Sequence, residues 1–154
     1  MKIVNIKFNF KLFIILICVT ILILSSIFLI NLFHSNTIVM DNENYAQVLK
    51  DVHNNIDAYI GKKVYTNGYI FRVEDFTENR FVVARDMIVS ENDYRIVGFL
   101  CEYDKIKNFE NNVWVEIKGV ISLKDYHGPM PVIEVSEINR ITTPNETHVF
   151  PPKT

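Results

Sequence analysis

Hydrophobic and polar positions follow three different patterns along the chain, and each predicts a different kind of element. From Leu12 to Phe33 nearly every residue is apolar. As a helix this run would be about 33 Å long, which is enough to cross a bilayer. The run is longer than the apolar stretch of a secretory signal, and no small-x-small cleavage site follows it. We therefore expect a transmembrane helix over residues 12–33 that anchors the protein and is not removed.

The charges beside this run predict its orientation. Lys2, Lys7 and Lys11 precede it, whereas residues 34–44 contain no lysine or arginine. By the positive-inside rule, a short basic tail (residues 1–11) lies in the cytoplasm. The chain beyond the span then faces the outside of the cell membrane, as expected for a single-pass membrane protein.

A period of three and four residues begins after a polar tether at residues 34–44. Apolar side chains recur at this spacing over residues 45–60, with Asp41 or Asn42 available as a cap and Gly61 as the stop. This pattern predicts an amphipathic helix of about four turns that packs on the elements after it.

Beyond the helix the period falls to two, interrupted by turn-prone residues, which indicates β-strands. A short helix-compatible stretch at residues 104–112 lies where a five-stranded Greek-key barrel inserts its connecting helix. Gly68, Gly98 and Gly119 interrupt apolar strands, as a tightly coiled barrel requires. The five predicted strands are Lys63–Val73, Arg80–Val89, Arg95–Tyr103, Val113–Leu123 and Met130–Ile138.

These elements predict a mainly β fold with one N-terminal membrane helix. The soluble part would be a five-stranded, OB-like Greek-key barrel preceded by the amphipathic helix, where OB stands for oligonucleotide/oligosaccharide binding. We place this barrel domain at residues 45–142 and an extended, proline-containing tail at residues 143–154. A small SH3-like barrel is the structural alternative, but the long first strand with a central glycine favours the OB form.

Charge and cysteine content narrow the range of partners. The chain has 16 lysines and arginines, three of them before the apolar run, and 18 acids, all after it, so the part beyond the run carries a net charge of −5. Such a surface repels polyanions, and we expect no nucleic-acid partner. Cys101 is the only thiol in this part, which excludes an internal disulfide there. We expect a small buried hydrophobic residue, with an intermolecular bridge as the alternative.

The stretch from about Tyr45 to Pro152 resembles the C-terminal domain of the YcgQ-like family, whose members are described as permease subunits. The resemblance implies an OB-like domain that faces away from the cytoplasm and associates with a multi-spanning, permease-like partner. The motifs that carry it are GKKVYTNGYIFR (61–72), FVVAR (81–85), IVGFLCEY (96–103), WVEIKG (114–119), PVIEVSEI (131–138) and HVFPP (148–152).

The chain departs from the family pattern in two places. Members of the family have more than one membrane span before this domain, whereas a single span is found here. They also carry a cysteine-containing segment with an aspartate where this chain has residues 89–94, without cysteine. Asp93 is at the position of that aspartate, and Arg85 matches the family pattern directly.

The loops at residues 74–79 and 125–129 would flank the ligand face of an OB barrel. Tyr126 and His127 could stack and hydrogen-bond there, and Arg85 could pair with a carboxylate or phosphate. Arg85 could equally form a structural ion pair with a neighbouring acid. The candidate ligand-binding residues are Arg85, Asp93, Tyr126 and His127.

Catalytic and metal-binding motifs are absent from the sequence. His53, His127 and His148 share no metal-ligand spacing, and neither a nucleophile elbow nor a phosphate loop is present. We therefore expect no metal, no cofactor and no enzyme activity. The leading hypothesis is a membrane-anchored, extracytoplasmic binding or accessory module associated with an integral membrane protein of permease type. The alternatives are a nucleic-acid- or glycan-binding OB domain and, less favoured, a metal-dependent enzyme.

Overall fold

The computed structural model describes residues 15–26 and 37–152 and divides the chain into two compact units, residues 1–36 and 37–154. Residues 15–26 are helical. Within the described ranges, no helix is both long and apolar enough to cross a membrane. The predicted span continues on both sides of this helix into residues outside those ranges.

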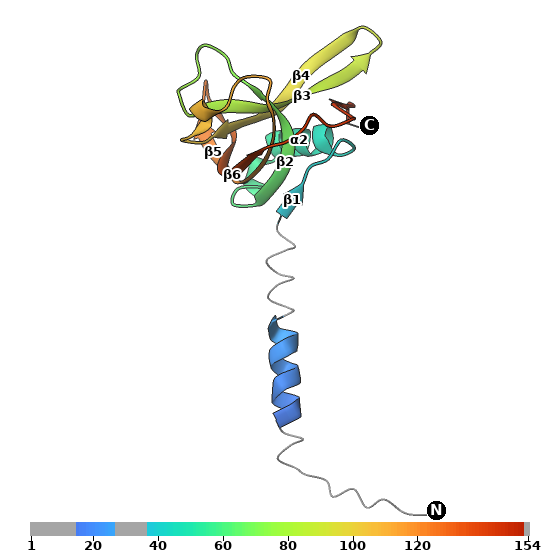
Figure 1. The fold of residues 1–154 in the computed structure, drawn as a ribbon, viewed down its shortest axis with the longest axis vertical. Coiled ribbons are helices and arrows are strands. Elements are labelled where there is room, and N and C mark those ends of the chain that lie inside the picture. Colours follow the sequence, from blue (N-terminus) through green and yellow to red (C-terminus); the bar gives the residue numbers. More distant parts are fainter. Residues whose placement is uncertain (1–14, 27–36, 153–154) are drawn as a thin grey trace, which may run out of the picture. The chain divides into compact units, whose positions relative to one another are not determined.

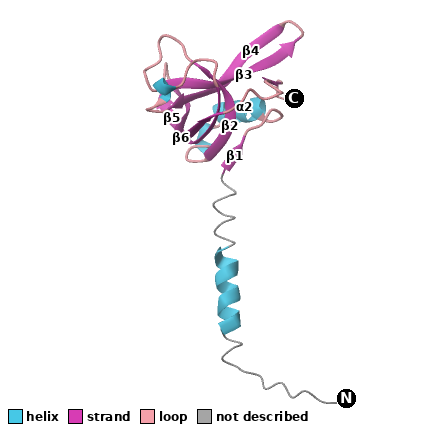
Figure 2. Ribbon diagram, viewed as in Figure 1, coloured by secondary structure: helices cyan, strands magenta, loops and turns pink. Residues whose placement is uncertain are grey.

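The second unit is built around a single, strongly bent sheet (Figures 1 and 2). Its central strands are β2 (Lys63–Phe71), β3 (Arg80–Ser90), β4 (Asp93–Glu102), β5 (Trp114–Asp125) and β6 (Pro129–Arg140). The strand order β2-β5-β6-β4-β3 is closed by a further β2–β3 pairing, so the five strands form a barrel. All neighbours are antiparallel except β4 and β6, which pair in parallel. This is the OB topology, as predicted, and each strand lies within two residues of its expected bounds.

Two further strands come from segments that the sequence assigned to the tether and the tail. Strand β1 (Thr37–Val39) pairs in parallel with β2, and β7 (His148–Val149) pairs in parallel with β3. Met40 and Val149 are almost fully buried, so each segment places an apolar side chain against the barrel. This burial explains why both segments are ordered on the sheet.

The amphipathic helix is shorter than its apolar pattern predicted. Helix α2 (Tyr45–Asn54) ends at a pair of asparagines, residues that favour helix ends over interiors. A 3₁₀ turn, η1 (Ile56–Ala58), and Gly61 with φ +80° then lead into β2. The predicted connecting helix at residues 104–112 is likewise only a 3₁₀ turn, η2 (Ile106–Asn108).

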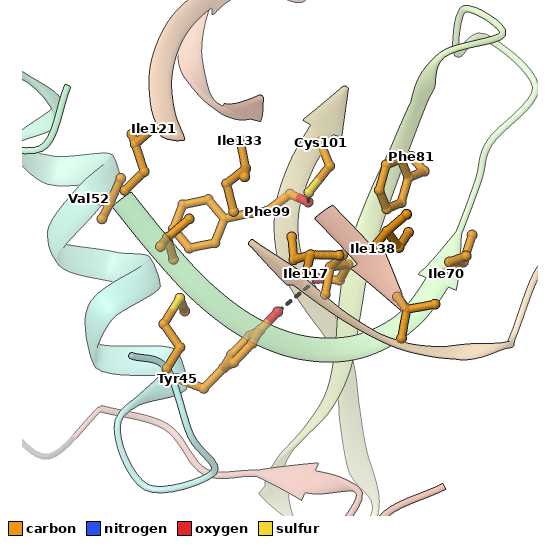
Figure 3. Close-up of a cluster of buried hydrophobic side chains, with 14 of the residues drawn as sticks. Tyr45, Val52, Ile70, Phe81, Phe99, Cys101, Ile117, Ile121, Ile133 and Ile138 are labelled. Atoms are coloured by element: carbon orange, nitrogen blue, oxygen red, sulfur yellow. Dashed lines mark hydrogen bonds between the residues drawn. The ribbon is translucent and has the colours of Figure 1, made fainter. Parts of the chain in front are cut away.

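The barrel core is apolar and is covered by α2 (Figure 3). Tyr45 and Val52 of the helix are fully buried, and the Tyr45 hydroxyl donates a hydrogen bond of 2.8 Å to the Val83 carbonyl. The other large core side chains are Ile70, Phe81, Phe99, Cys101, Ile106, Ile117, Ile121 and Ile133. Burying this surface is the main stabilising contribution to the fold.

Strands β3 and β4 continue beyond the barrel as a two-stranded ribbon, at the upper right of Figure 1. The β2–β3 pairing ends at Ala84 and the β4–β6 pairing begins at Leu100, whereas β3 and β4 stay paired as far as Ser90 and Asp93. A register shift lies near the ribbon tip, between Ile88 and Ser90. Residues 85–97 therefore form an arm whose two strands pair mainly with each other.

Candidate functional site

Two loops meet at one end of the barrel, as the sequence predicted. The β2–β3 loop contributes Asp75 and Phe76, and the β5–β6 loop contributes Tyr126 and His127. The Phe76 and Tyr126 rings are 5.5 Å apart, edge to face, and the Tyr126 hydroxyl donates a hydrogen bond of 2.6 Å to Asp75 Oδ2. The Nε2 atom of His127 lies 3.3 Å from the same oxygen. We call these four residues the loop-end cluster.

The tight turn between β5 and β6 is what presents Tyr126 and His127 to the other loop. Asp125 pairs with Pro129, which leaves three residues in the connection. His127 has φ +55° and Gly128 has φ +124°, both in the left-handed region, and the Tyr126 N–H donates to the Gly128 carbonyl at 2.9 Å. The two adjacent rings of Tyr126 and His127 thus lie on a chain reversal, 4.5 Å apart.

The electrostatics of the cluster centre on the Asp75 carboxylate. Hydrogen bonds from Tyr126 and His127 lower the pKa of Asp75. The hydrogen bond between Tyr126 and Asp75 also raises the pKa of Tyr126. Asp75 and His127 keep 54% and 76% of their side chains exposed, so both can still reach a ligand. The arrangement offers aromatic faces and one anionic acceptor.

The charges on the adjoining strands are mutually paired. Arg80 lies over the Tyr126 ring at 5.6 Å and forms an ion pair of 2.9 Å with Glu102. Lys124 contacts Glu102 at 3.6 Å and Glu134 at 2.7 Å. These pairs hold both cations next to carboxylates, which favours neutral polar ligands over polyanions.

Arg85 lies away from these loops and is 1% exposed. All five of its N–H groups donate to oxygens of the chain itself. Its Nε donates to the Asn67 carbonyl at 3.1 Å, Nη1 to the carbonyls of Glu146 and Thr147 at 3.3 Å each, and Nη2 to the side-chain oxygens of Asn42 at 2.6 Å and Asn67 at 2.5 Å. Within the described ranges no carboxylate is paired with it, so neither the predicted ion pair nor a free donor is found.

Asp93 lies at the start of β4, at the tip of the ribbon. Its carboxylate is 3.2 Å from Nη2 of Arg95, and both side chains are largely exposed. The structure therefore brings Tyr126 and His127 together, but it places Arg85 and Asp93 in two other regions.

The other residues that the sequence singled out, Cys101, Trp114 and His53, lie within or pack against the barrel. Cys101 is fully buried, as expected, and burial raises the pKa of its thiol. Trp114 is half-buried beside Arg85 and Tyr69, and His53 stacks on Phe99 at 5.6 Å. In the part of the chain that the structure covers, no group of three or more His, Cys, Asp or Glu could hold a metal ion.

Residues 29–151 match the model of the DUF1980 C-terminal domain. The chain belongs to this family. The UPF0703 protein YcgQ of Bacillus subtilis (strain 168) is 23% identical over 118 residues, which cover 73% of this chain and 41% of YcgQ. The chain thus spans less than half the length of that relative, and the resemblance to YcgQ-like proteins is confirmed.

Two solved structures show a limited similarity to this domain. Yeast RPA bound to ssDNA has a TM-score of 0.40 at 15% identity, with 71% of this chain and 78% of that one covered. The N-terminal domain of PriB from Thermoanaerobacter tencongensis has a TM-score of 0.37 at 11% identity, with 53% and 97% covered.

Two features of this domain are not predicted by the sequence pattern. The loop at residues 74–79 was expected at the ligand face, but nothing in its sequence singled out Asp75 or Phe76. Asn42 and Asn67 were also missed as partners of Arg85. A lone arginine inside an apolar strand is the one signal that could have prompted a search for buried acceptors.

Proposed function

We propose that this chain is a membrane-anchored, extracytoplasmic binding module that docks on an integral membrane protein of permease type. The observation that carries the proposal is the loop-end cluster: the Tyr126 hydroxyl of one loop donates to the Asp75 carboxylate of the other at 2.6 Å. Loops in these two positions form the rim of the ligand face in OB barrels. Aromatic and acidic side chains held there in a fixed geometry suit recognition of an exposed protein loop.

The anchoring and the compartment are supported by the sequence. The apolar run at residues 12–33 has the length of a membrane span, and lysines precede it while residues 34–44 carry none. A barrel held this way would lie close to the outer surface of the membrane, within reach of the extracytoplasmic loops of a multi-spanning protein. The permease type of the partner is taken from the resemblance to YcgQ-like proteins.

The charge balance supports a protein partner over a polyanion. The part beyond the apolar run carries a net charge of −5, and Arg80 and Lys124 beside the cluster are already paired with Glu102 and Glu134. A nucleic acid would have to displace these carboxylates to gain contact with cations.

The test is affinity purification of the full-length chain from detergent-solubilised membranes of its native host, followed by quantitative mass spectrometry. We expect a multi-spanning protein to be enriched with the unaltered chain. The Tyr126→Ala/His127→Ala variant should lower its recovery at least tenfold, which corresponds to about 1.4 kcal/mol of binding free energy.

A matched pair of variants provides the control. Tyr65 donates to Glu116 at 2.8 Å much as Tyr126 donates to Asp75, but it lies at the opposite end of β2 from the loop. Tyr126→Phe should reduce recovery and Tyr65→Phe should not. If no multi-spanning protein is enriched, or if both variants act alike, the proposal fails.

A further inference from the structure

One edge of the ribbon has no strand beside it among residues 15–26 and 37–152. Residues 93–99 of β4 pair with β3 on one side, and β6 joins the other side of β4 only at Leu100, Cys101 and Glu102. No other described strand pairs with residues 93–99. In an antiparallel ladder every second residue directs its N–H and C=O away from its partner strand. These backbone groups are therefore available to a further strand.

The edge of β4 is only weakly blocked against pairing with a further strand. Proline, charged side chains and bulges are the common means. Here the bulge lies in β3, between Ile88 and Ser90, and the charges of this edge are the opposite pair Asp93 and Arg95. Strand β4 contains neither proline nor lysine, and its exposed side chains include Tyr94 at 59% and Ile96 at 53%. An exposed strand edge with apolar side chains is a template for pairing with another chain.

The opposite edge of the ribbon already accepts an added strand. On β3, Asp86 pairs with His148 and Met87 with Val149, and the Val149 side chain is fully buried there. The chain thus closes the β3 edge with its own tail and leaves the β4 edge open.

We propose that the open edge of β4 pairs with the same edge of a second copy of this chain. A two-fold axis perpendicular to the ribbon makes the two strands antiparallel, and the interface is then self-complementary. The pairing is centred on Tyr94, which lies opposite Tyr94 of the second copy. It spans residues 93–95 of each copy, because residues 91–92 form the turn before β4. The proposal is independent of the docking function inferred above.

Charge favours this register over the one centred on Arg95. Centring on Tyr94 places Asp93 opposite Arg95 of the second copy, and the reverse, so that two ion pairs form across the axis. Centring on Arg95 would oppose two guanidinium groups. Centring on Ile96 would place Asp93 opposite Phe99, with no cation across from it.

Forming these ion pairs between copies costs little, because only a weak ion pair within each copy is lost. Arg95 and Asp93 contact each other at 3.2 Å within one copy, but their side chains are 63% and 42% exposed. An ion pair this exposed contributes little to stability, so it can be exchanged for the pair between copies. The paired edge is short compared with standard interfaces, and the association is accordingly weak and dependent on concentration.

Disulfide trapping in the full-length chain tests the pairing. In a Cys18→Ser background the buried Cys101 is the only remaining thiol. The proposed register brings the two Tyr94 Cα atoms to about 4.5–5.5 Å, within the range that a disulfide spans. Under mild oxidation, Tyr94→Cys should form covalent dimers at least tenfold faster than the exposed control Ile60→Cys. Equal rates would overturn the proposal, as would faster dimerisation of Ile96→Cys than of Tyr94→Cys.

Exchanging the charges of Asp93 and Arg95 tests the register, because a folding defect would not be reversed by the second substitution. In the Tyr94→Cys background, Arg95→Asp opposes two carboxylates and should slow trapping at least fivefold. The double variant Asp93→Arg/Arg95→Asp restores opposite charges and should recover the original rate. Failure of the double variant to recover, with its thermal melt unchanged, would contradict the proposed pairing.

Discussion

The guanidinium of Arg85 lies over the indole ring of Trp114, with its Cζ 4.8 Å from the ring centroid. This stacking complements the five hydrogen bonds that Arg85 donates to uncharged oxygens. Desolvation lowers the pKa of Arg85, so the buried charge depends on these dipoles for compensation. Its acceptors belong to β2, to the segment before α2 and to the segment before β7, and Arg85 therefore joins both ends of the domain to the barrel.

Replacing Arg85 should be among the most destabilising single changes in the domain. Arg85→Met keeps an apolar stem but leaves five acceptors without their donor and removes the link between three segments, and we expect a loss of about 3 kcal/mol in the free energy of unfolding. The measurement is urea denaturation followed by tryptophan fluorescence. Arg95→Met is the control, since Arg95 is 63% exposed and should cost under about 0.5 kcal/mol. A loss below about 1 kcal/mol for Arg85→Met would contradict this role.

The contrast between Arg85 and the strands shows what local sequence pattern can predict here. Strand positions follow from the alternation of buried and exposed residues, a local property, and the five barrel strands were placed to within two residues. The partners of Arg85 include Asn42, 43 residues before it, and Glu146, 61 residues after it. The periodicity of hydrophobic residues along the chain contains no information about contacts between residues so far apart in the sequence. The ordering of β1 has the same origin, because it depends on Met40 reaching the core.

The mid-strand glycines were predicted from the curvature that a small barrel needs, and their surroundings make that prediction quantitative. A Cβ atom on Gly68 would lie 2.5 Å from the Ala84 carbonyl oxygen of the crossing strand β3. Because backbone cannot move aside as a flexible side chain can, Gly68→Ala should cost about 3 kcal/mol. Thermal denaturation measures this loss. Gly128→Ala is a poor control because φ there is +124°, so we choose Ser136→Ala, at an exposed position of β6, and expect little change.

Cys101 should behave as a hydrophobic residue and not as a reactive thiol. It is fully buried, its thiol donates to the Phe99 carbonyl, and burial raises its pKa. In the Cys18→Ser chain at pH 8, a thiol reagent such as Ellman's should label less than about a tenth of Cys101 in the time that labels it fully in urea. Rapid labelling of the native chain would mean that the barrel opens at β4.

The hydrogen bonds of the loop-end cluster should be visible in the titration of Asp75. Tyr126 is the largest cause of its lowered pKa and His127 the second. A carboxyl whose pKa is depressed in the folded state contributes stability above its ordinary value of 3.8, and this contribution is lost as the pH falls through the lowered pKa. Carbon-13 NMR of the Asp75 carboxyl should therefore give a midpoint below 3.8 in the unaltered chain.

Tyr126→Phe removes the larger of these two hydrogen bonds and keeps the aromatic ring. We expect the Asp75 midpoint to rise toward its ordinary value and the acid-induced change in the loops to begin at higher pH. Tyr65→Phe removes an equivalent tyrosine–carboxylate bond elsewhere and should leave Asp75 unchanged. If the Asp75 midpoint is the same in both variants, Tyr126 does not hold the carboxylate in solution, and the loops would then be free to separate. The docking proposal depends on the two loops staying together, because ordering them on binding would cost free energy and lower the affinity for the partner.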